Sequence, residues 1–481
     1  MPVAVIAGGS IAGLAAALAL HGIGYRVHVL ERGDEPPPRR AGEAAPDRPR
    51  PTAPQALHSH TLTSLGLRVL RERAPQVLAA ARDAGAHLLD LTLAMPAGAT
   101  DAAREPGDDE LAALGCRRPT LERALHDTVR TLPGVTLHHR ATLAALELDP
   151  ARRAVRAVRT TAGERLPADI VVDATGRTAA HRAWLRDAGT PPPEDRAEPS
   201  GLRGHTRVYR LRSATAPGPL NRGNAAGDIW DHYAGVLHPG DGDTFSIALA
   251  TLPGDRGLSA LRTAAGFTAA ARATPGLGPW LADGVSEPLS PVRAITAPPN
   301  TLRGAALAPR PPVTGLYPLG DAACTTNPLF GRGMSLALEH AFRLADLLAA
   351  HPRPGEEAAH DAARLTTTLL LPWYEHSAAA DRARIARWQA AVDGAAPPPP
   401  PPADPADPPG PAALAAAAAT DAVVWRALTR TLMTLATPAQ ALGDDKILAR
   451  IRQAPPPPAR PQAPPHAELV RLVTQAAGAR P

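Results

Sequence analysis

The first 31 positions alternate between apolar runs and a glycine-rich break. Residues 3–7 are apolar and partly β-branched, as in a buried parallel strand. A glycine-rich turn over residues 8–13 follows, and residues 14–20 are rich in Ala and Leu, which favour helix. Residues 26–30 alternate like a second strand and end at Glu31. This order predicts a strand–turn–helix–strand unit with a glycine-rich first connection.

The next segment mixes loop, helix and strand patterns. Residues 36–54 are rich in Pro, Arg and Ala with little periodicity, which predicts a long loop. Residues 59–83 and 118–132 have helical spacing. Residues 135–148 and 154–172 have strand patterns, and we expect their strands to close the first sheet.

Residues 190–300 carry a different pattern, in which strand signals recur at short intervals. These signals lie at 205–213, 233–238 and 244–251. The sequence Pro-Gly-Asp-Gly at 239–242 is typical of a hairpin turn between the last two. An antiparallel sheet is therefore predicted, inserted before the chain returns to the first unit.

The last third of the chain is helical between proline runs. Helical spacing extends from Gly333 to about residue 391. Proline runs then indicate a linker of polyproline-II type over residues 392–411. Residues 412–481 are rich in Ala and Leu and predict a helical tail, which we expect either to pack on the rest or to cover the inserted sheet.

Composition and charge exclude several classes of protein. The 481 residues are 44% hydrophobic and 20% charged, which suffices for a large core. Among 51 Lys and Arg residues only Lys446 is a lysine, and the arginines are interleaved with acids, so we expect no nucleic-acid partner. Cys116 and Cys324 lie outside any Cys-x-x-Cys motif, which predicts no disulfide framework, no metal site and a reduced cytoplasmic location. The apolar run at 3–20 lacks a basic start, so neither a signal peptide nor a membrane span is expected.

The glycine-rich turn, Gly-Gly-Ser-Ile-Ala-Gly, predicts a dinucleotide site. Gly8 permits the tight turn, and Gly13 lets helix and strand pack closely. The helix N-terminus offers free N–H groups and a partial positive charge to a pyrophosphate. Ser10 replaces the usual middle glycine, but it is small and its hydroxyl can face a phosphate. Glu31 is predicted to bind the adenosine ribose, and its charge disfavours NADP there. A glycine-rich turn of another α/β domain is the alternative.

Two later segments distinguish FAD from NAD, because FAD requires the chain to return to its flavin end. Residues 168–177 combine a buried strand with a small-residue turn where backbone can lie against a cofactor. Residues 316–340 contain a strand, Gly320-Asp321, a Pro/Gly loop and a helix that opens near Gly333. Asp321 can accept hydrogen bonds from ribityl hydroxyls, and the helix N-terminus is predicted to face the pyrimidine edge of the flavin.

Together these motifs resemble those of the FAD-dependent monooxygenases of the aromatic-hydroxylase superfamily. Residues 50–60 also resemble the R-x-G-x-P-Q-x-x-H-x-H segment of a bacterial subgroup that includes polyether epoxidases, although Thr52 stands where that subgroup has Gly. Arg118 begins Arg-Pro-Thr-Leu, which resembles the family's Arg-x-x-Leu near the cofactor. Two further departures are Thr175, where the family has Asp, and Cys324, where many relatives have His.

The resemblance implies an α/β fold with a Rossmann-like FAD-binding domain in two parts, residues 1–190 and 301–391. It also implies an inserted antiparallel β-sheet substrate domain over 191–300 and a helical C-terminal tail. The cofactor-binding residues that it implies are Gly8, Gly9, Ser10, Ile11, Ala12, Gly13, Glu31, Arg32, Arg118, Ala174, Gly176, Gly320, Asp321, Pro328, Gly331, Gly333 and Met334. The catalytic candidates are Arg50, Gln55 and His60, for which a solvated Arg and a structural His are the alternatives.

The function implied is insertion of one oxygen atom from O2 into a small organic secondary metabolite by reduced FAD. Hydroxylation, epoxidation and Baeyer–Villiger insertion all fit. Since no second glycine-rich unit is evident for a nicotinamide, NAD(P)H would dock transiently or a separate flavin reductase would act. The alternatives are a reductase of isoprenoid-like double bonds, a flavin halogenase and a non-enzymatic FAD-binding module. A halogenase is disfavoured because the six Trp residues form no Trp-x-Trp pair and the single Lys lies in the tail.

Overall fold

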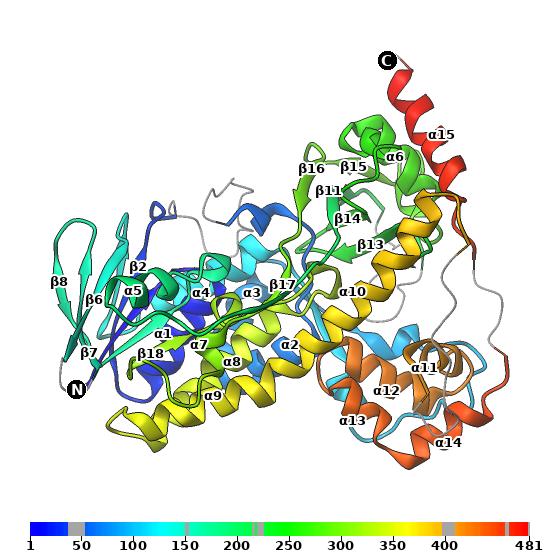
Figure 1. Ribbon diagram of the computed structural model, residues 1–481. Coiled ribbons are helices and arrows are strands. Elements are labelled where there is room, and N and C mark those ends of the chain that lie inside the picture. Colours follow the sequence, from blue (N-terminus) through cyan, green and yellow to red (C-terminus); the bar gives the residue numbers. More distant parts are fainter. Residues whose placement is uncertain are drawn as a thin grey trace.

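The computed structural model describes residues 1–36, 53–149, 153–213, 217–218, 226–396, 409–456 and 461–479. A helix-covered parallel sheet lies at one end of the molecule and an antiparallel sheet at the other (Figure 1). The long helix α10 (Leu371–Val392) runs between them, and the helices α11 to α14 form a separate group beside the antiparallel sheet (Figure 1). Among the helices in the described ranges, none has the length and apolarity needed to cross a bilayer.

The parallel sheet has the order β18-β9-β1-β2-β5. Its strands are β18 (Leu316–Pro318), β9 (Ile170–Asp173), β1 (Val3–Ala7), β2 (Arg26–Glu31) and β5 (Val135–His139). Successive residues of β1 point to opposite faces. Ile6 packs with the helices of one face and Val5 with a second cluster on the other. Because both faces of the sheet are covered, the sequences of its strands are largely apolar.

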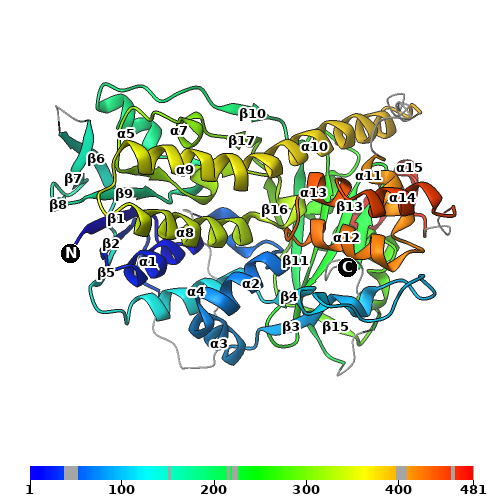
Figure 2. The same ribbon diagram turned by 90° about the horizontal axis from the view of Figure 1, so that it is seen from below.

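Helices far apart in the sequence cover one face of this sheet. Figure 2 shows α8 (Gly333–Ala350) between α1 (Ile11–Gly22) and α9 (Glu356–Leu369), and the three share one hydrophobic core. Three further helices complete this layer: α2 (Ser64–Arg73), α3 (Pro75–Asp83) and α4 (Arg118–Val129). The start of the chain and the segment after Asp321 are therefore packed together.

The expectation that residues 135–148 and 154–172 close the parallel sheet is only partly right. β5 and β9 join it, but β6 (Leu143–Asp149), β7 (Ala154–Thr160) and β8 (Arg165–Pro167) form a separate antiparallel sheet. Consecutive strands joined by short connections can pair only antiparallel, whereas parallel pairing needs a long crossover. Together with α5 (His181–Asp187), this small sheet covers the other face of the parallel sheet.

The second main sheet is antiparallel, as the sequence predicts. Its order is β12-β13-β14-β11-β15, and β16 also pairs with β11. The strands are β11 (Arg203–Leu211), β12 (Ala226–Ile229), β13 (Ala234–Pro239), β14 (Thr244–Thr251), β15 (Ser286–Pro288) and β16 (Arg293–Thr296). The predicted turn at 239–242 joins β13 to β14. Phe267 of α6 (Ala264–Ala273) and Leu469 of α15 (His466–Gly478) belong to its apolar core, so the last helix covers this sheet.

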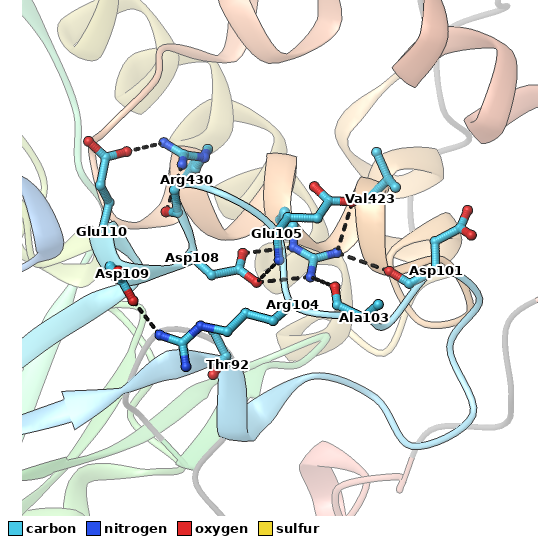
Figure 3. A network of polar contacts seen from close by, with 12 residues as sticks. Thr92, Asp101, Ala103, Arg104, Glu105, Asp108, Asp109, Glu110, Val423 and Arg430 are labelled. Carbon is cyan, nitrogen blue, oxygen red and sulfur yellow. Dashed lines mark hydrogen bonds and ion pairs between the residues drawn. The ribbon is translucent and has the colours of Figure 1, made fainter.

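The other tail helices pack elsewhere. They are α11 (Pro411–Ala417), α12 (Ala422–Leu432), α13 (Pro438–Leu442) and α14 (Asp445–Gln453). Their core includes Leu111 and Ala113, next to and within β4 (Ala112–Gly115), which pairs with β3 (His87–Asp90). Figure 3 shows the polar rim of this contact, where Arg430 of α12 donates to Glu110 at 2.7 Å. The buried Arg426 donates to Asp108 at 2.8 Å, which fixes α12 to the same segment.

Two chain crossings connect the main sheets. They include β10 (Arg196–Glu198) and β17 (Asn300–Leu302), which pair with each other, and β19 (Cys324–Thr325) pairs with β17. The short helix α7 (Gly304–Leu307) follows β17. These crossings pass beside the loop that leads from Asp321 into α8, so the antiparallel sheet is held against that loop.

Candidate active site

The glycine-rich turn between β1 and α1 is closed by contacts that only glycine permits. Gly8 has φ +107°, and a Cβ there would lie 2.4 Å from the carbonyl oxygen of Ala174. A Cβ on Gly13 would lie 1.8 Å from the carbonyl oxygen of Gly8. The turn therefore lies directly against the end of β9, which brings two of the predicted segments into contact.

Glu31, the last residue of β2, is hydrogen-bonded to the same turn. Its Oε2 accepts a hydrogen bond of 2.7 Å from the backbone N–H of Gly9, and its Oε1 accepts one of 2.8 Å from Gly33. A carboxylate has about four lone-pair positions, so both oxygens can accept further hydrogen bonds. Glu31 and the adjacent Arg32 line the cavity described below.

Ser10 and Arg118 are joined at the start of α1. Arg118 Nη2 donates to Ser10 Oγ at 3.1 Å, and Ser10 Oγ donates to Glu122 Oε2 at 3.0 Å. Arg118 is the first residue of α4, so α4 is fixed over the N-terminus of α1. The Ser10 hydroxyl, which the sequence suggested could face a phosphate, is thus engaged with protein partners.

The third segment places a carboxylate and a second helix N-terminus in the same region. Gly320 has φ +58° and packs between Ala12 and Ala337, with its Cβ position 3.2 and 3.3 Å from theirs. Burial raises the pKa of the Asp321 carboxyl, and the nearby arginines, Arg118 first among them, oppose that shift. Asp321 is half-buried and lies near the N-terminus of α8, where a Cβ on Gly333 would be 3.9 Å from its Oδ1.

One cavity joins these segments. Its volume is about 320 Å³, which is in the range of small-molecule sites. The predicted residues that line it are Gly8, Ser10, Ile11, Ala12, Glu31, Arg32, Gln55, His60, Arg118, Ala174, Gly176, Asp321, Pro328, Gly331, Gly333 and Met334. Gly9, Gly13 and Gly320 are not among the lining residues and support the turns behind them. Arg50 lies outside the described residues.

Beside Gln55 and His60, which the sequence did predict, the cavity has a wall from the antiparallel sheet that the sequence did not predict. His238 of β13, Ile295 of β16 and Ala297 contribute to it, together with His58. His58 Nδ1 lies 3.1 Å from Thr206 Oγ1, and Ser59 Oγ lies 2.8 Å from Ser246 Oγ. No alternation along β13 singles out His238, and its contact with the cavity depends on tertiary packing.

The histidines of this wall are held neutral. His60 Nδ1 lies 2.8 Å from the carbonyl oxygen of His58, so this nitrogen must carry the proton. Burial lowers the pKa of His60 to about 3 and the pKa of His58 and His238 to about 4. Gln55 Oε1 is buried next to them without a hydrogen-bond partner within the described structure. A polar ligand that donates a hydrogen bond would satisfy that oxygen.

Metal and thiol chemistry receive no support from the described residues. No group of three or more His, Cys, Asp or Glu side chains there could hold a metal ion. Cys116 and Cys324 are both buried, and burial raises the pKa of both thiols. Both thiols are therefore protonated at neutral pH, which is unfavourable for a nucleophile.

Comparisons with known proteins support the fold. No protein-family model matches the chain. Protein Rv3254 of Mycobacterium tuberculosis is 28% identical over 363 residues, which cover 72% of this chain and 73% of that protein. PqsL of Pseudomonas aeruginosa, a “probable FAD-dependent monooxygenase”, superposes with a TM-score of 0.58 at 19% identity, over 82% of this chain and 99% of PqsL. The myxobacterial chondrochloren halogenase CndH, a FAD-dependent halogenase, superposes with a TM-score of 0.53 at 15% identity, over 75% and 78% of the two chains.

These structural similarities confirm the predicted fold class. The chain has the mixed α/β fold of the FAD-dependent monooxygenases and related flavin halogenases, with a parallel sheet, an antiparallel sheet and a helical C-terminal region.

Proposed function

We propose that the cavity binds FAD and that the protein is a flavin-dependent monooxygenase acting on a small organic molecule. The observation that carries this proposal is the convergence of three segments, near residues 8–13, 174–176 and 320–334, on one cavity. A dinucleotide extended along that cavity would contact all three. The fold shared with PqsL supports the same assignment.

The donor groups of the cavity fit such a cofactor. Neither α1 nor α8 has a side chain that caps its N-terminus, so both helices keep N–H groups for a ligand. Three arginines of the cavity lining, Arg32, Arg118 and Arg177, add positive charge suited to a pyrophosphate. Glu31 would accept from the adenosine ribose, and Asp321 from the ribityl chain.

Bound FAD would supply the two-electron chemistry that activates O2. The protein would bind and orient the substrate and would exclude water from the site. The wall formed by His58, His60, His238 and Ile295 would hold the substrate opposite the N-terminus of α8. Because these imidazoles stay neutral, they would accept or donate hydrogen bonds without adding charge to the substrate site. NAD(P)H would be the transient reductant, or a separate flavin reductase would take its place.

A halogenase is the second candidate because CndH has the same fold. The only lysine, Lys446, lies on α14, and no lysine is among the described residues that line the cavity. The resemblance of residues 50–60 and the lack of a lysine among the described lining residues therefore favour oxygen insertion over halogenation. The fold, which PqsL and CndH share, does not distinguish the two activities.

The decisive experiment follows the fate of O2 in the FAD-loaded protein. NAD(P)H oxidation, O2 consumption and ¹⁸O incorporation from ¹⁸O₂ are measured against a panel of small aromatic and polyene compounds, with 2-aminobenzoylacetate, the molecule bound in a PqsL structure, among them. We expect substrate-dependent NAD(P)H oxidation and one ¹⁸O atom in the product. Anaerobic substrate reduction would instead indicate a reductase, and halide incorporation a halogenase.

A further inference from the structure

A buried arginine at the cavity has aromatic partners in place of a carboxylate. Arg332 stands at the N-cap of α8, lines the cavity and is 3% exposed. Its guanidinium carbon lies 4.6 Å from the ring centroid of Phe330 and 4.6 Å from that of Trp373. Within the described part of the chain no carboxylate forms an ion pair with it. Asp381, whose charge attracts it from farther away, pairs with Arg384 at 3.0 Å.

The cage around Arg332 holds the side chain without neutralising it. The ring faces attract a cation, but they carry no net charge. Arg332 Nη1 lies 3.3 Å from His376 Nδ1, and burial, together with Arg332 itself, lowers the pKa of His376 to about 4. His376 is therefore a neutral acceptor. Burial lowers the pKa of Arg332 to about 9, which leaves the guanidinium charged at neutral pH. Its Nε has no hydrogen-bond partner among the described residues.

An unneutralised charge in a poorly hydrated position acts over a longer distance than a charge in water. Gly331 and Gly333, on either side of Arg332, also line the cavity. The N-terminus of α8 adds its partial positive charge at the same place. Arg332 and the helix N-terminus therefore both favour a negative charge at this end of the cavity, where the Asp321 carboxyl also lies near Gly333.

We propose that Arg332 stabilises the negative charge that the flavin ring acquires on reduction, and so sets the reduction potential of the bound cofactor. The inference rests on the proposed function. A hydride from the nicotinamide carries two electrons and one proton to the neutral oxidised ring, which leaves the reduced ring with one negative charge. A positive charge at this end of the cavity would favour the reduced over the oxidised form. A carboxylate on the substrate is the other anion that the same charge could hold, and the experiment separates the two.

The test removes the positive charge of Arg332 and keeps a side chain of similar length. Arg332→Met removes the cation, Arg332→Gln is a second neutral variant in case the first does not fold, and Arg332→Lys restores the charge. Arg73→Met is the matched control, because Arg73 also stacks on an aromatic ring, Phe342 at 5.1 Å, but does not line the cavity. For each FAD-loaded protein, the midpoint potential is measured with reference dyes, and sulfite affinity is measured by the bleaching of flavin absorbance.

We expect the neutral variants to bind sulfite at least tenfold more weakly than the wild type. A tenfold loss of preference for reduced FAD corresponds to a midpoint potential lower by about 30 mV. Arg332→Lys should recover most of both values, and Arg73→Met should change neither. A folded neutral variant with FAD bound and with unchanged potential and sulfite affinity would overturn the inference.

Two further outcomes are distinguishable. If a neutral variant keeps the potential but loses affinity for benzoate relative to benzamide, both measured by flavin absorbance changes, the charge serves a substrate carboxylate and the inference is wrong. If the wild-type protein binds no FAD at all, the proposed function itself fails, before any variant is compared.

Discussion

The buried carboxylate of Asp381 on α10 accepts a hydrogen bond of 2.8 Å from Asn327 Nδ2, in the loop that lines the cavity. Its other oxygen accepts from Asn300 Nδ2 at 2.7 Å, where β17 begins. Arg384 donates to the same carboxylate and to the carbonyl oxygen of Ser200, on the other crossing between the sheets. One carboxylate thus joins the cavity loop to both chain crossings.

Asp381→Asn should therefore be strongly destabilising. One carboxylate oxygen becomes an NH₂ group facing donors, and Arg384 loses its buried partner. We expect the free energy of unfolding to fall by about 3 kcal/mol, as when one member of a buried pair is removed. Urea unfolding followed by circular dichroism measures it.

The control for that variant is Asp283→Asn. Asp283 also pairs with an arginine, Arg272 at 2.7 Å, but its side chain is 97% exposed, so we expect a change below about 0.5 kcal/mol. Equal effects of the two substitutions would show that the Asp381 cluster does not hold the fold together.

Gly13→Ala should abolish tight FAD binding, because the new Cβ would lie 1.8 Å from the Gly8 carbonyl oxygen and force the turn away from α1. Gly22→Ala, in the same helix, meets no atom within 4 Å and should bind FAD like the wild type. Fluorescence titration with FAD measures both dissociation constants. We expect a rise of at least tenfold for Gly13→Ala alone, and equal affinities would refute this role of the turn.

Glu31→Gln tests which end of the cavity would hold the adenosine. The charge and one acceptor that could meet the ribose are lost, so we expect FAD affinity to fall about tenfold, a typical effect of a hydrogen bond to a charged group. Affinity for flavin mononucleotide, which lacks adenosine, should not change. Calorimetric titration with both flavins measures the difference, and a parallel loss for both would place the adenosine elsewhere.

The neutral histidine wall predicts how stability depends on pH. Burial lowers the pKa of His58 and His238 to about 4 and that of His60 to about 3, whereas unfolded histidine titrates near 6.5. Between about pH 4 and 6.5 the unfolded chain binds more protons than the folded chain, so the free energy of unfolding rises with pH there and is level above it.

His238→Gln should reduce that slope by up to about 1.4 kcal/mol per pH unit, the value for one proton. Urea unfolding of wild type and variant at intervals from pH 4.5 to 7.5 gives both slopes. Parallel curves would mean that His238 is protonated equally in the folded and unfolded states.

The local pattern determined some elements well and others poorly. The strands β1 and β2 and their glycine turn match the prediction closely. The steric requirements of this turn fall on residues close together in the sequence, Gly8 and Gly13, so the local pattern reveals them. The separate sheet of β6 to β8 was missed as such, although the exposed Arg156 and Arg159 of β7 indicate one solvated face.

Long-range packing explains what the sequence could not show. Arg332 looks in sequence like a solvated arginine between two glycines, and only Trp373 and His376, some forty residues later, reveal it as buried. In the same way, the apolar faces of α12 and α15 predict that each helix docks, but not that they dock on different parts of the molecule.

The most direct test of the central claim is a spectrophotometric titration of the flavin-free protein with FAD. If the three segments enclose one extended flavin nucleotide, the protein takes up one FAD per chain with a structured shift of the flavin absorbance, and Gly13→Ala loses that uptake. A correctly folded wild-type protein that remains colourless and binds no FAD would contradict the claim.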